Sequence, residues 1–172
     1  MTTARQPSER VRRGIVALFY LGLLFMAGIA LGVDWLCGDW GRFRLGALSA
    51  AIGTTLTVGG LALVSWSVHI QYTLGQGTPA PVAATLRLVT TGPYRCTRNP
   101  MTLGALALYL GIGLAVGSGS VLALTAIVFS LLLAHIHRHE TRELTGRFGS
   151  DYLAYKASTP FLIPRCRGWV VR

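Results

Sequence analysis

Long apolar stretches separated by short polar segments are the main pattern of this sequence. Residues 14–33, 45–68 and 101–134 contain no charged side chain. Each stretch is long enough to cross the hydrocarbon core of a bilayer, about 30 Å thick, as an α-helix. The pattern therefore predicts an integral membrane protein built from helices.

The third stretch is too long for a single crossing. As one helix, residues 101–134 would extend about 51 Å, well beyond the hydrocarbon thickness. The run Gly117-Ser118-Gly119-Ser120 lies near its middle, and clustered Gly and Ser residues interrupt helices. We therefore predict a hairpin of two spans, 101–116 and 121–139. The first arm is short for a crossing, so it either begins in the interface or thins the bilayer locally.

The predicted fold is all-α, with about four transmembrane helices in a single membrane domain that covers residues 1–172. The spans comprise residues 14–33, 45–72, 101–116 and 121–139. A short helical segment is expected after the last span. The run that follows Arg13 is longer than the apolar core of a secretory signal, so it is interpreted as a retained first span.

Small residues mark the second span as a packing surface. Small side chains let transmembrane helices approach closely. In this span they are Gly46, Ala50, Gly53, Gly59 and Gly60. Gly111 and Gly113 in the third span are interpreted in the same way.

The charge content supports the membrane assignment. Only 13% of the 172 residues are charged, against about 25% in a typical soluble domain. This deficit excludes a soluble globular enzyme and a disordered chain. The net charge of +10 could indicate nucleic acid, but the basic residues flank the apolar spans, where a positive-inside bias accounts for them. We expect membrane lipids as partners and no nucleic acid.

The distribution of basic residues predicts the orientation. The N-terminal flank carries four arginines, the loop after the second span three, and the tail from Arg138 onward seven basic residues, whereas the last hairpin turn has none. The positive-inside rule then predicts cytoplasmic N- and C-termini, in what we expect to be a bacterial inner membrane. The two polar segments, 75–100 and 135–164, face the cytoplasm together in this arrangement.

Cysteines and histidines give no strong indication of a metal site. Cys37, Cys96 and Cys166 are far apart and odd in number, so they specify neither a disulfide framework nor zinc, and unpaired thiols are expected. His135 and His139 share a helix face with Glu143, but the surrounding sequence does not match HExxH. We predict no metal.

The first polar segment has the composition of a structured turn followed by a helix start. Gly75 to Pro81 is too rich in Gly and Pro for helix, and Pro100 is well suited to a first helical turn. Arg98 and Asn99 would then lie at a helix N-terminus, where N–H groups and a guanidinium can bind a carboxylate or phosphate. Alternatively, Arg95 and Arg98 only contact lipid headgroups.

The second polar segment continues the last span out of the membrane. Glu140 extends this helix, and Phe148-Gly149 is a stop signal. Tyr152 and Tyr155, three residues apart, would share one side of a short following helix. Alternatively, they are interfacial tyrosines beside a solvated helix.

Together these segments resemble the isoprenylcysteine carboxyl methyltransferase and phospholipid methyltransferase family of integral membrane enzymes. The resemblance runs from about residue 69 to 164 in the family's order. Its parts are Gly77-Thr78-Pro79-Ala80-Pro81, Gly92-Pro93-Tyr94, Arg98-Asn99-Pro100-Met101, Gly104, Glu140, Leu144, Phe148-Gly149, Tyr152, Tyr155 and Pro160 to Pro164.

The resemblance implies a small helical bundle that uses S-adenosylmethionine as methyl donor. Arg98, Glu140 and His69 are the residues expected to take part in catalysis. The residues expected to bind the cofactor are Gly77, Tyr94, Arg98, Asn99, Pro100, Leu103, Gly104, Glu140, Phe148, Gly149, Tyr152 and Tyr155.

Three positions depart from the family pattern. Asn99 stands where many relatives have His, Thr102 stands where an aromatic residue is usual, and Thr141 replaces the second of two paired glutamates. The last change affects the details of cofactor binding more than the fold.

The predicted function is methyl transfer to a lipophilic small molecule or lipid that enters from the bilayer. An isoprenylcysteine-type carboxylate would need no general base, whereas an amine or thiol would need one, with His69 or Glu140 as candidates. A phospholipid or other lipid amine or thiol is the alternative acceptor. Two other functions stay open: a membrane reductase similar to sterol reductases, and a non-catalytic lipid-binding bundle.

Overall fold

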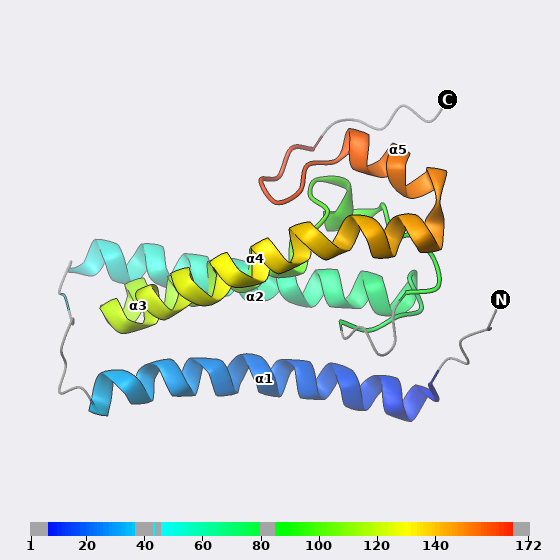
Figure 1. The fold of residues 1–172 in the computed structure, drawn as a ribbon. Helices are drawn as coiled ribbons and strands as arrows, with labels where there is room; N and C mark the ends of the chain where they lie inside the picture. Colours follow the sequence, from blue (N-terminus) through cyan, green and yellow to red (C-terminus); the bar gives the residue numbers. More distant parts are fainter. Residues whose placement is uncertain (1–6, 37–42, 44–45, 80–84, 167–172) are drawn as a thin grey trace.

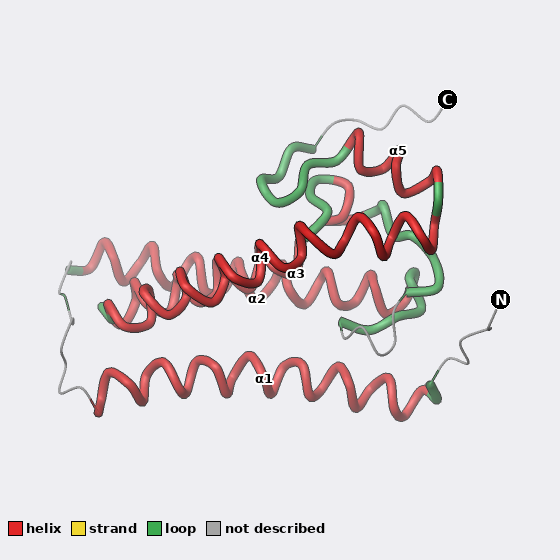
Figure 2. Tube along the Cα trace, viewed as in Figure 1, coloured by secondary structure: helices red, strands yellow, loops and turns green. Residues whose placement is uncertain are grey.

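The computed structural model describes residues 7–36, 43, 46–79 and 85–166, and these residues form helices and loops without strands. The α-helices are α1 (Glu9–Leu36), α2 (Ala47–Thr73), α3 (Pro100–Val116), α4 (Gly119–Phe148) and α5 (Ser150–Ser158). A short 3₁₀ helix, η2 (Gly92–Arg95), precedes α3. Figure 2 shows this all-helical composition, which agrees with the predicted fold class.

The four longer helices lie side by side along a common direction, and α5 folds back beside the end of α4 (Figure 1). The start of α1 and the end of α2 meet where Arg12 donates a 2.7 Å hydrogen bond to the carbonyl of Tyr72. Helices α1, α2 and α4 are long and apolar enough to cross a membrane, whereas α3 is a shorter apolar helix. The chain is an integral membrane protein, and a fourth crossing by α3 stays a prediction.

Glycines bring the backbones of α2 and α3 into direct contact. A Cβ on Gly60 would lie 2.5 Å from the amide nitrogen of Leu108, and one on Gly53 would lie 2.4 Å from that of Ala115. From the other side, a Cβ on Gly111 would lie 2.4 Å from the Thr57 amide nitrogen, and one on Gly104 would lie 2.9 Å from the Gly60 carbonyl oxygen. The predicted packing surface on the second span is therefore confirmed for two of its glycines.

The other small residues of that surface behave differently. A Cβ on Gly46 or Gly59 would meet nothing within 4 Å. Gly113 faces the last helix instead, where a Cβ would approach the Leu122 side chain at 2.6 Å. Close approach thus depends on individual positions, because only some small residues of a span lie on the face that meets the neighbouring helix.

The hairpin turn between α3 and α4 lies where the sequence predicts a break. Gly117 has a left-handed conformation with φ of 72°, which ends α3 and which glycine adopts without steric cost. The Ser118 hydroxyl then caps α4 by accepting a hydrogen bond from the Val121 amide at 2.9 Å. The break is narrower than predicted, since Gly119 and Ser120 already belong to α4.

Helix α4 is long enough to carry its end beyond the membrane. It has 30 residues, and Glu140 follows its first residue by 21 positions, or about 32 Å at 1.5 Å per residue. The helix stops at Phe148, with Gly149 as its C-cap, as the sequence predicts. The prediction that Glu140 lies at the polar edge of the hydrocarbon layer is compatible with this length.

A disulfide bond joins Cys96 to Cys166, so the expectation of unpaired thiols is wrong for these two residues. Their sequence separation of 70 positions hid the pairing in the sequence. The segment after α5 returns to the start of α3, where Arg98 donates its amide to the Pro160 carbonyl and Arg165 donates its amide to the Cys96 carbonyl, both at 2.9 Å. Cys37 lies outside the described residues.

Candidate functional site

A buried ion pair lies where the start of α3 meets the extension of α4. The guanidinium of Arg98 is 3.0 Å from a carboxylate oxygen of Glu140, and the two side chains are only 8% and 10% exposed. Buried charges are costly unless they are paired and hydrogen-bonded. The sequence placed each residue at the edge of its own span, and the fold brings the two together.

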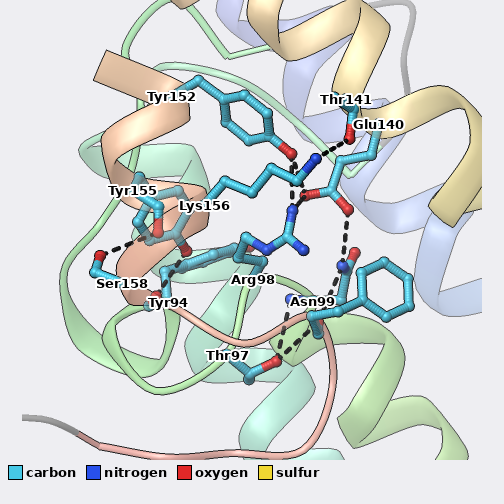
Figure 3. Close-up of polar contacts among 11 residues, drawn as sticks. Tyr94, Thr97, Arg98, Asn99, Glu140, Thr141, Tyr152, Tyr155, Lys156 and Ser158 are labelled. Carbon is cyan, nitrogen blue, oxygen red and sulfur yellow. Dashed lines mark hydrogen bonds and ion pairs between the residues drawn. The ribbon is translucent and has the colours of Figure 1, made fainter. Parts of the chain in front are cut away.

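Neighbouring polar groups complete this pair, as Figure 3 shows. Arg98 donates a 2.8 Å hydrogen bond to the Tyr152 hydroxyl, which in turn donates to Glu140 at 3.0 Å. Asn99 donates its side-chain amide to the second oxygen of Glu140 at 3.2 Å. Both carboxylate oxygens therefore accept hydrogen bonds. The four residues Arg98, Asn99, Glu140 and Tyr152 are called the polar cluster below.

The segment after α5 holds the polar cluster from outside. Asn99 and Thr97 each donate a 3.2 Å hydrogen bond to the carbonyl of Phe161. The Phe161 ring also lies 5.6 Å from the guanidinium carbon of Arg98, within the range of a cation–π contact. Sequence reasoning placed a motif between Pro160 and Pro164 but did not identify Phe161, because one aromatic residue in a short loop carries no pattern of its own.

Two tyrosines connect η2 to α5 beside the polar cluster. Tyr155 donates a 2.7 Å hydrogen bond to the Tyr94 carbonyl, and the Tyr94 hydroxyl donates to the Gln71 side chain at 3.3 Å. Burial raises the pKa of both phenols well above the usual value of 10.0. Burial, followed by the nearby Glu140 carboxylate, also raises the pKa of Tyr152. All three therefore stay protonated donors at neutral pH.

A cavity of about 680 Å³ opens from the polar cluster toward the interior of the bundle. Its polar end is lined by Gln71, Tyr94, Arg98, Asn99, Glu140 and Tyr155. Its remaining walls are mostly apolar and come from α1, α3, α4 and the loop before η2. Apolar walls with a few convergent polar groups are typical of small-molecule sites, and the volume lies within their usual range.

The predicted site residues fall into two groups. Those that line the cavity are Tyr94, Arg98, Asn99, Pro100, Glu140, Phe148 and Tyr155. Those outside its lining are Gly77, Leu103, Gly104, Gly149, Tyr152 and His69. Tyr152 belongs to the polar cluster all the same, and its side chain is completely buried.

Two residues of the second group lie away from the cavity lining, and the roles expected of them stay predictions. His69 is exposed on α2 and lies outside the cavity lining, so its placement gives no support to a general-base role. Gly104 packs against α2, where a Cβ would lie 2.9 Å from Gly60 and Val64 atoms. Gly104 thus belongs to the packing surface between α2 and α3, and His69 belongs to the exposed surface of α2. The order of motifs along the chain does not determine how a helix is rotated about its axis, so it does not determine which residues face the cavity.

Gly77 supports the loop beside the cavity. A Cβ at this position would lie 2.7 Å from the backbone of Thr85, so the loop closes tightly on itself there. Pro79 and Thr85 of this loop line the cavity. Gly77 therefore affects the shape of the cavity indirectly, by allowing Pro79 and Thr85 to take their positions in its lining.

The first helix contributes a wall that sequence reasoning missed. Phe19, Gly22, Leu23 and Met26 of α1 line the apolar part of the cavity. Leu23 also accepts, through its carbonyl, a 2.7 Å hydrogen bond from the Tyr109 hydroxyl of α3. A tyrosine in the middle of an uncharged span was the available signal, since a buried phenol usually finds a hydrogen-bond partner.

The histidines near the end of α4 form no metal-binding group in the described part of the chain. The rings of His135 and His139 lie 4.4 Å apart. Glu143, the expected third member of that face, pairs instead with Arg147 at 3.5 Å.

Comparison with known proteins identifies the family. Residues 48–151 match the phospholipid methyltransferase family, which confirms the resemblance found in the sequence. The cobalt-zinc-cadmium resistance protein CzcN of Cupriavidus metallidurans is 36% identical over 78 residues, which cover 45% of this chain and 36% of that protein. No solved structure matches. Because the family match covers α2 to the start of α5, including Arg98 and Glu140, the chain belongs to the phospholipid methyltransferase family.

Proposed function

We propose that this protein is an S-adenosylmethionine-dependent methyltransferase that acts on a lipophilic acceptor within the membrane. The observation that carries the proposal is the Arg98–Glu140 ion pair at the polar end of a cavity with otherwise apolar walls. Family membership supports a membrane methyltransferase of a lipid or related substrate. The chemistry of the cavity supports the choice of cofactor and of acceptor class.

The residues at the polar end fit S-adenosylmethionine. When bound, this cofactor supplies an electrophilic methyl group on a sulfonium. It also carries an ammonium, a carboxylate and an adenine ring, so its site must offer both signs of charge. Glu140 would bind the ammonium or the ribose hydroxyls, and Arg98 would bind the carboxylate. The Arg98 Nε–H is buried without a hydrogen-bond partner, which leaves one donor available for a ligand.

Aromatic residues supply the remaining surface that the cofactor needs. Tyr94 and Tyr155 at the polar end, and Phe148 elsewhere in the lining, offer ring faces for an adenine or a cation. Methyl transfer is a displacement that depends on alignment and on exclusion of water. The polar cluster, held by Phe161 from outside, would keep the cofactor fixed and the reacting end of the cavity dry.

The lining favours an acceptor that is already ionised. The described lining residues include neither histidine, lysine nor cysteine, and both oxygens of Glu140 accept hydrogen bonds. A carboxylate acceptor needs no general base, whereas an amine or thiol must lose a proton. We therefore place a lipophilic carboxylate first and a lipid amine or thiol second.

Isothermal titration of the purified protein with S-adenosylmethionine tests the cofactor assignment. Glu140→Gln and Arg98→Met should each weaken binding at least tenfold. Glu143→Gln and Arg95→Gln are matched controls, because Glu143 is half exposed and Arg95 is exposed in the same segment as Arg98. Equal binding of S-adenosylmethionine by the wild type and all four variants would contradict the proposal. Binding of a nicotinamide cofactor instead of S-adenosylmethionine would favour the reductase alternative.

Labelled methyl transfer then identifies the acceptor. The protein in lipid vesicles is incubated with methyl-labelled S-adenosylmethionine and a lipid extract, and the labelled products are treated with base. A methyl ester releases its label as methanol, whereas N-methyl and S-methyl products keep it. We expect base-labile label, and stable label would point to the amine or thiol alternative.

The proposed orientation has both termini and the polar cluster on the cytoplasmic side, where S-adenosylmethionine is available. The basic flanks support this placement, whereas the Cys96–Cys166 disulfide at the same end is more typical of an oxidising compartment. Fusion of green fluorescent protein or alkaline phosphatase after residue 172 reports the side directly. Fluorescence without phosphatase activity is the expected result.

A further inference from the structure

The apolar part of the cavity includes a contact between three helices, and Met26 and Val128 line the cavity next to this contact. Tyr109 of α3 and Phe129 of α4 are 7% and 6% exposed, and their ring centroids lie 5.9 Å apart. The Tyr109 hydroxyl donates to the Leu23 carbonyl of α1 at 2.7 Å. All three residues line the cavity. They are called the floor below.

The distance from the polar cluster to the floor can be counted along two helices. Tyr109 of α3 follows Asn99, the N-cap of this helix, by ten residues, which is about 15 Å at 1.5 Å per residue. Phe129 precedes Glu140 by eleven residues on α4, which is about 16 Å. The two helices therefore agree on the depth of the apolar part. An extended hydrocarbon chain of about twelve carbons spans this depth.

We propose that the floor limits the acceptor to a single apolar chain of about twelve carbons, with Tyr109 and Phe129 as specificity-determining residues. This proposal rests on the proposed function, since it places the reacting end of the acceptor at the polar cluster. A lipid with two long acyl chains would have to leave part of them outside a cavity of about 680 Å³ that also holds a cofactor. A single-chain amphiphile with an anionic head meets both requirements.

Gly22 offers a way to shorten the apolar part without disturbing the fold. This residue lines the cavity next to Leu23, and a Cβ there would meet nothing within 4 Å. A leucine at this position would therefore extend into open space. Gly28 lies on the same helix, also has open space around its Cβ and is outside the lining, so Gly28→Leu is the matched control.

Photolabelling tests the floor independently of methyl transfer. Saturated carboxylates of eight, twelve and sixteen carbons, each with a diazirine at the chain end, are irradiated with the protein in lipid nanodiscs, and labelled residues are located by mass spectrometry. The twelve-carbon probe should label Leu23, Tyr109 or Phe129. Gly22→Leu should reduce this labelling at least fivefold, and Gly28→Leu should leave it unchanged.

Variants of the floor itself complete the test. Tyr109→Ala removes the ring and should let the sixteen-carbon probe label residues beyond the floor, whereas Tyr109→Phe keeps the ring and should keep the twelve-carbon limit. Floor labelling without any methyl transfer would leave the length limit standing and remove the proposed function. The limit is overturned by equal labelling of the floor with all three probes, by labelling that never reaches it, or by a Gly22→Leu protein that labels like the wild type.

Discussion

The guanidinium of Arg98 and the carboxylate of Glu140 lie 3.0 Å apart, although 42 positions separate them in the sequence. One residue directly precedes α3 and its N-cap, and the other lies near the end of α4. Their pairing joins the two arms of the hairpin at the same end as the C-terminal segment. Each side chain thus has a structural partner as well as a proposed role toward the cofactor, and the two contributions can be separated experimentally.

Removal of either charge of the pair should destabilise the protein strongly. Arg98→Met or Glu140→Met leaves the other charge buried without its partner, at a cost of about 3–5 kcal/mol. The double variant Arg98→Met with Glu140→Met removes both charges and should recover most of the lost stability. Thermal unfolding in detergent measures the effect.

Recovery of stability should not restore cofactor binding in that double variant. Its titration with S-adenosylmethionine should resemble that of the single variants, because both ligand-binding charges are gone. A double variant as unstable as the single ones would contradict the buried-pair interpretation.

Gly60 and Gly59 should respond in opposite ways to the same substitution. Gly60→Leu forces the backbones of α2 and α3 apart, since even a Cβ would lie 2.5 Å from the Leu108 amide nitrogen. We expect a loss of more than about 3 kcal/mol or failure to fold. Gly59→Leu meets open space and should be neutral or slightly stabilising, because leucine has the higher helix propensity. Size-exclusion chromatography and thermal unfolding distinguish the two.

Reduction of the Cys96–Cys166 disulfide should loosen the segment that holds the polar cluster. A bond that closes a loop of 70 residues contributes up to about 4 kcal/mol by restricting the unfolded chain. Limited proteolysis should cut after residue 158 faster in the Cys96→Ser, Cys166→Ser double variant than in the oxidised protein. Cys37→Ser serves as the control. Equal rates of digestion for Cys37→Ser and for the Cys96→Ser, Cys166→Ser double variant would argue against the bond.

Alkaline titration should reveal tyrosines that ionise late. Burial raises the pKa of Tyr94, Tyr152 and Tyr155 above 10.0, so their neutral forms are favoured in the folded state. Their contribution to stability is full below pH 10 and falls as the pH rises toward the folded-state values, because the unfolded chain loses these protons first. Ultraviolet absorbance of phenolate should show at least three late groups in the folded protein and none after denaturation.

The sequence predicted helix ends well because each end depends on a local signal. Pro100 begins α3, Gly117 ends it, and Gly149 ends α4, all through backbone conformations that neighbouring residues hardly change. The order of the motifs also identified Arg98 and Glu140 as site residues, although it does not show that their side chains are in contact. These features require only local chemistry or the order of the motifs along the chain.

Two kinds of feature were not predicted: those that depend on how a helix is rotated about its axis, and those that depend on the chain returning to contact a segment far away in the sequence. His69 carries a titratable ring near the polar end of α2, yet it is exposed, because the glycine face of that helix determines which residues point inward. The Cys96–Cys166 bond depends on the path of the chain after α5. The α1 wall, with Leu23 as acceptor for Tyr109, consists of apolar residues that look alike in any span.

The return of Phe161 to Asn99 also has a consequence for biosynthesis. Membrane helices leave the ribosome in order from the N-terminus, so α1 to α4 emerge before the segment around Phe161 does. The polar cluster, however, needs that segment and Tyr152 of α5 to satisfy its charges. A nascent chain can therefore insert and pair its helices first, and it acquires a competent site only after the last of these residues has been translated.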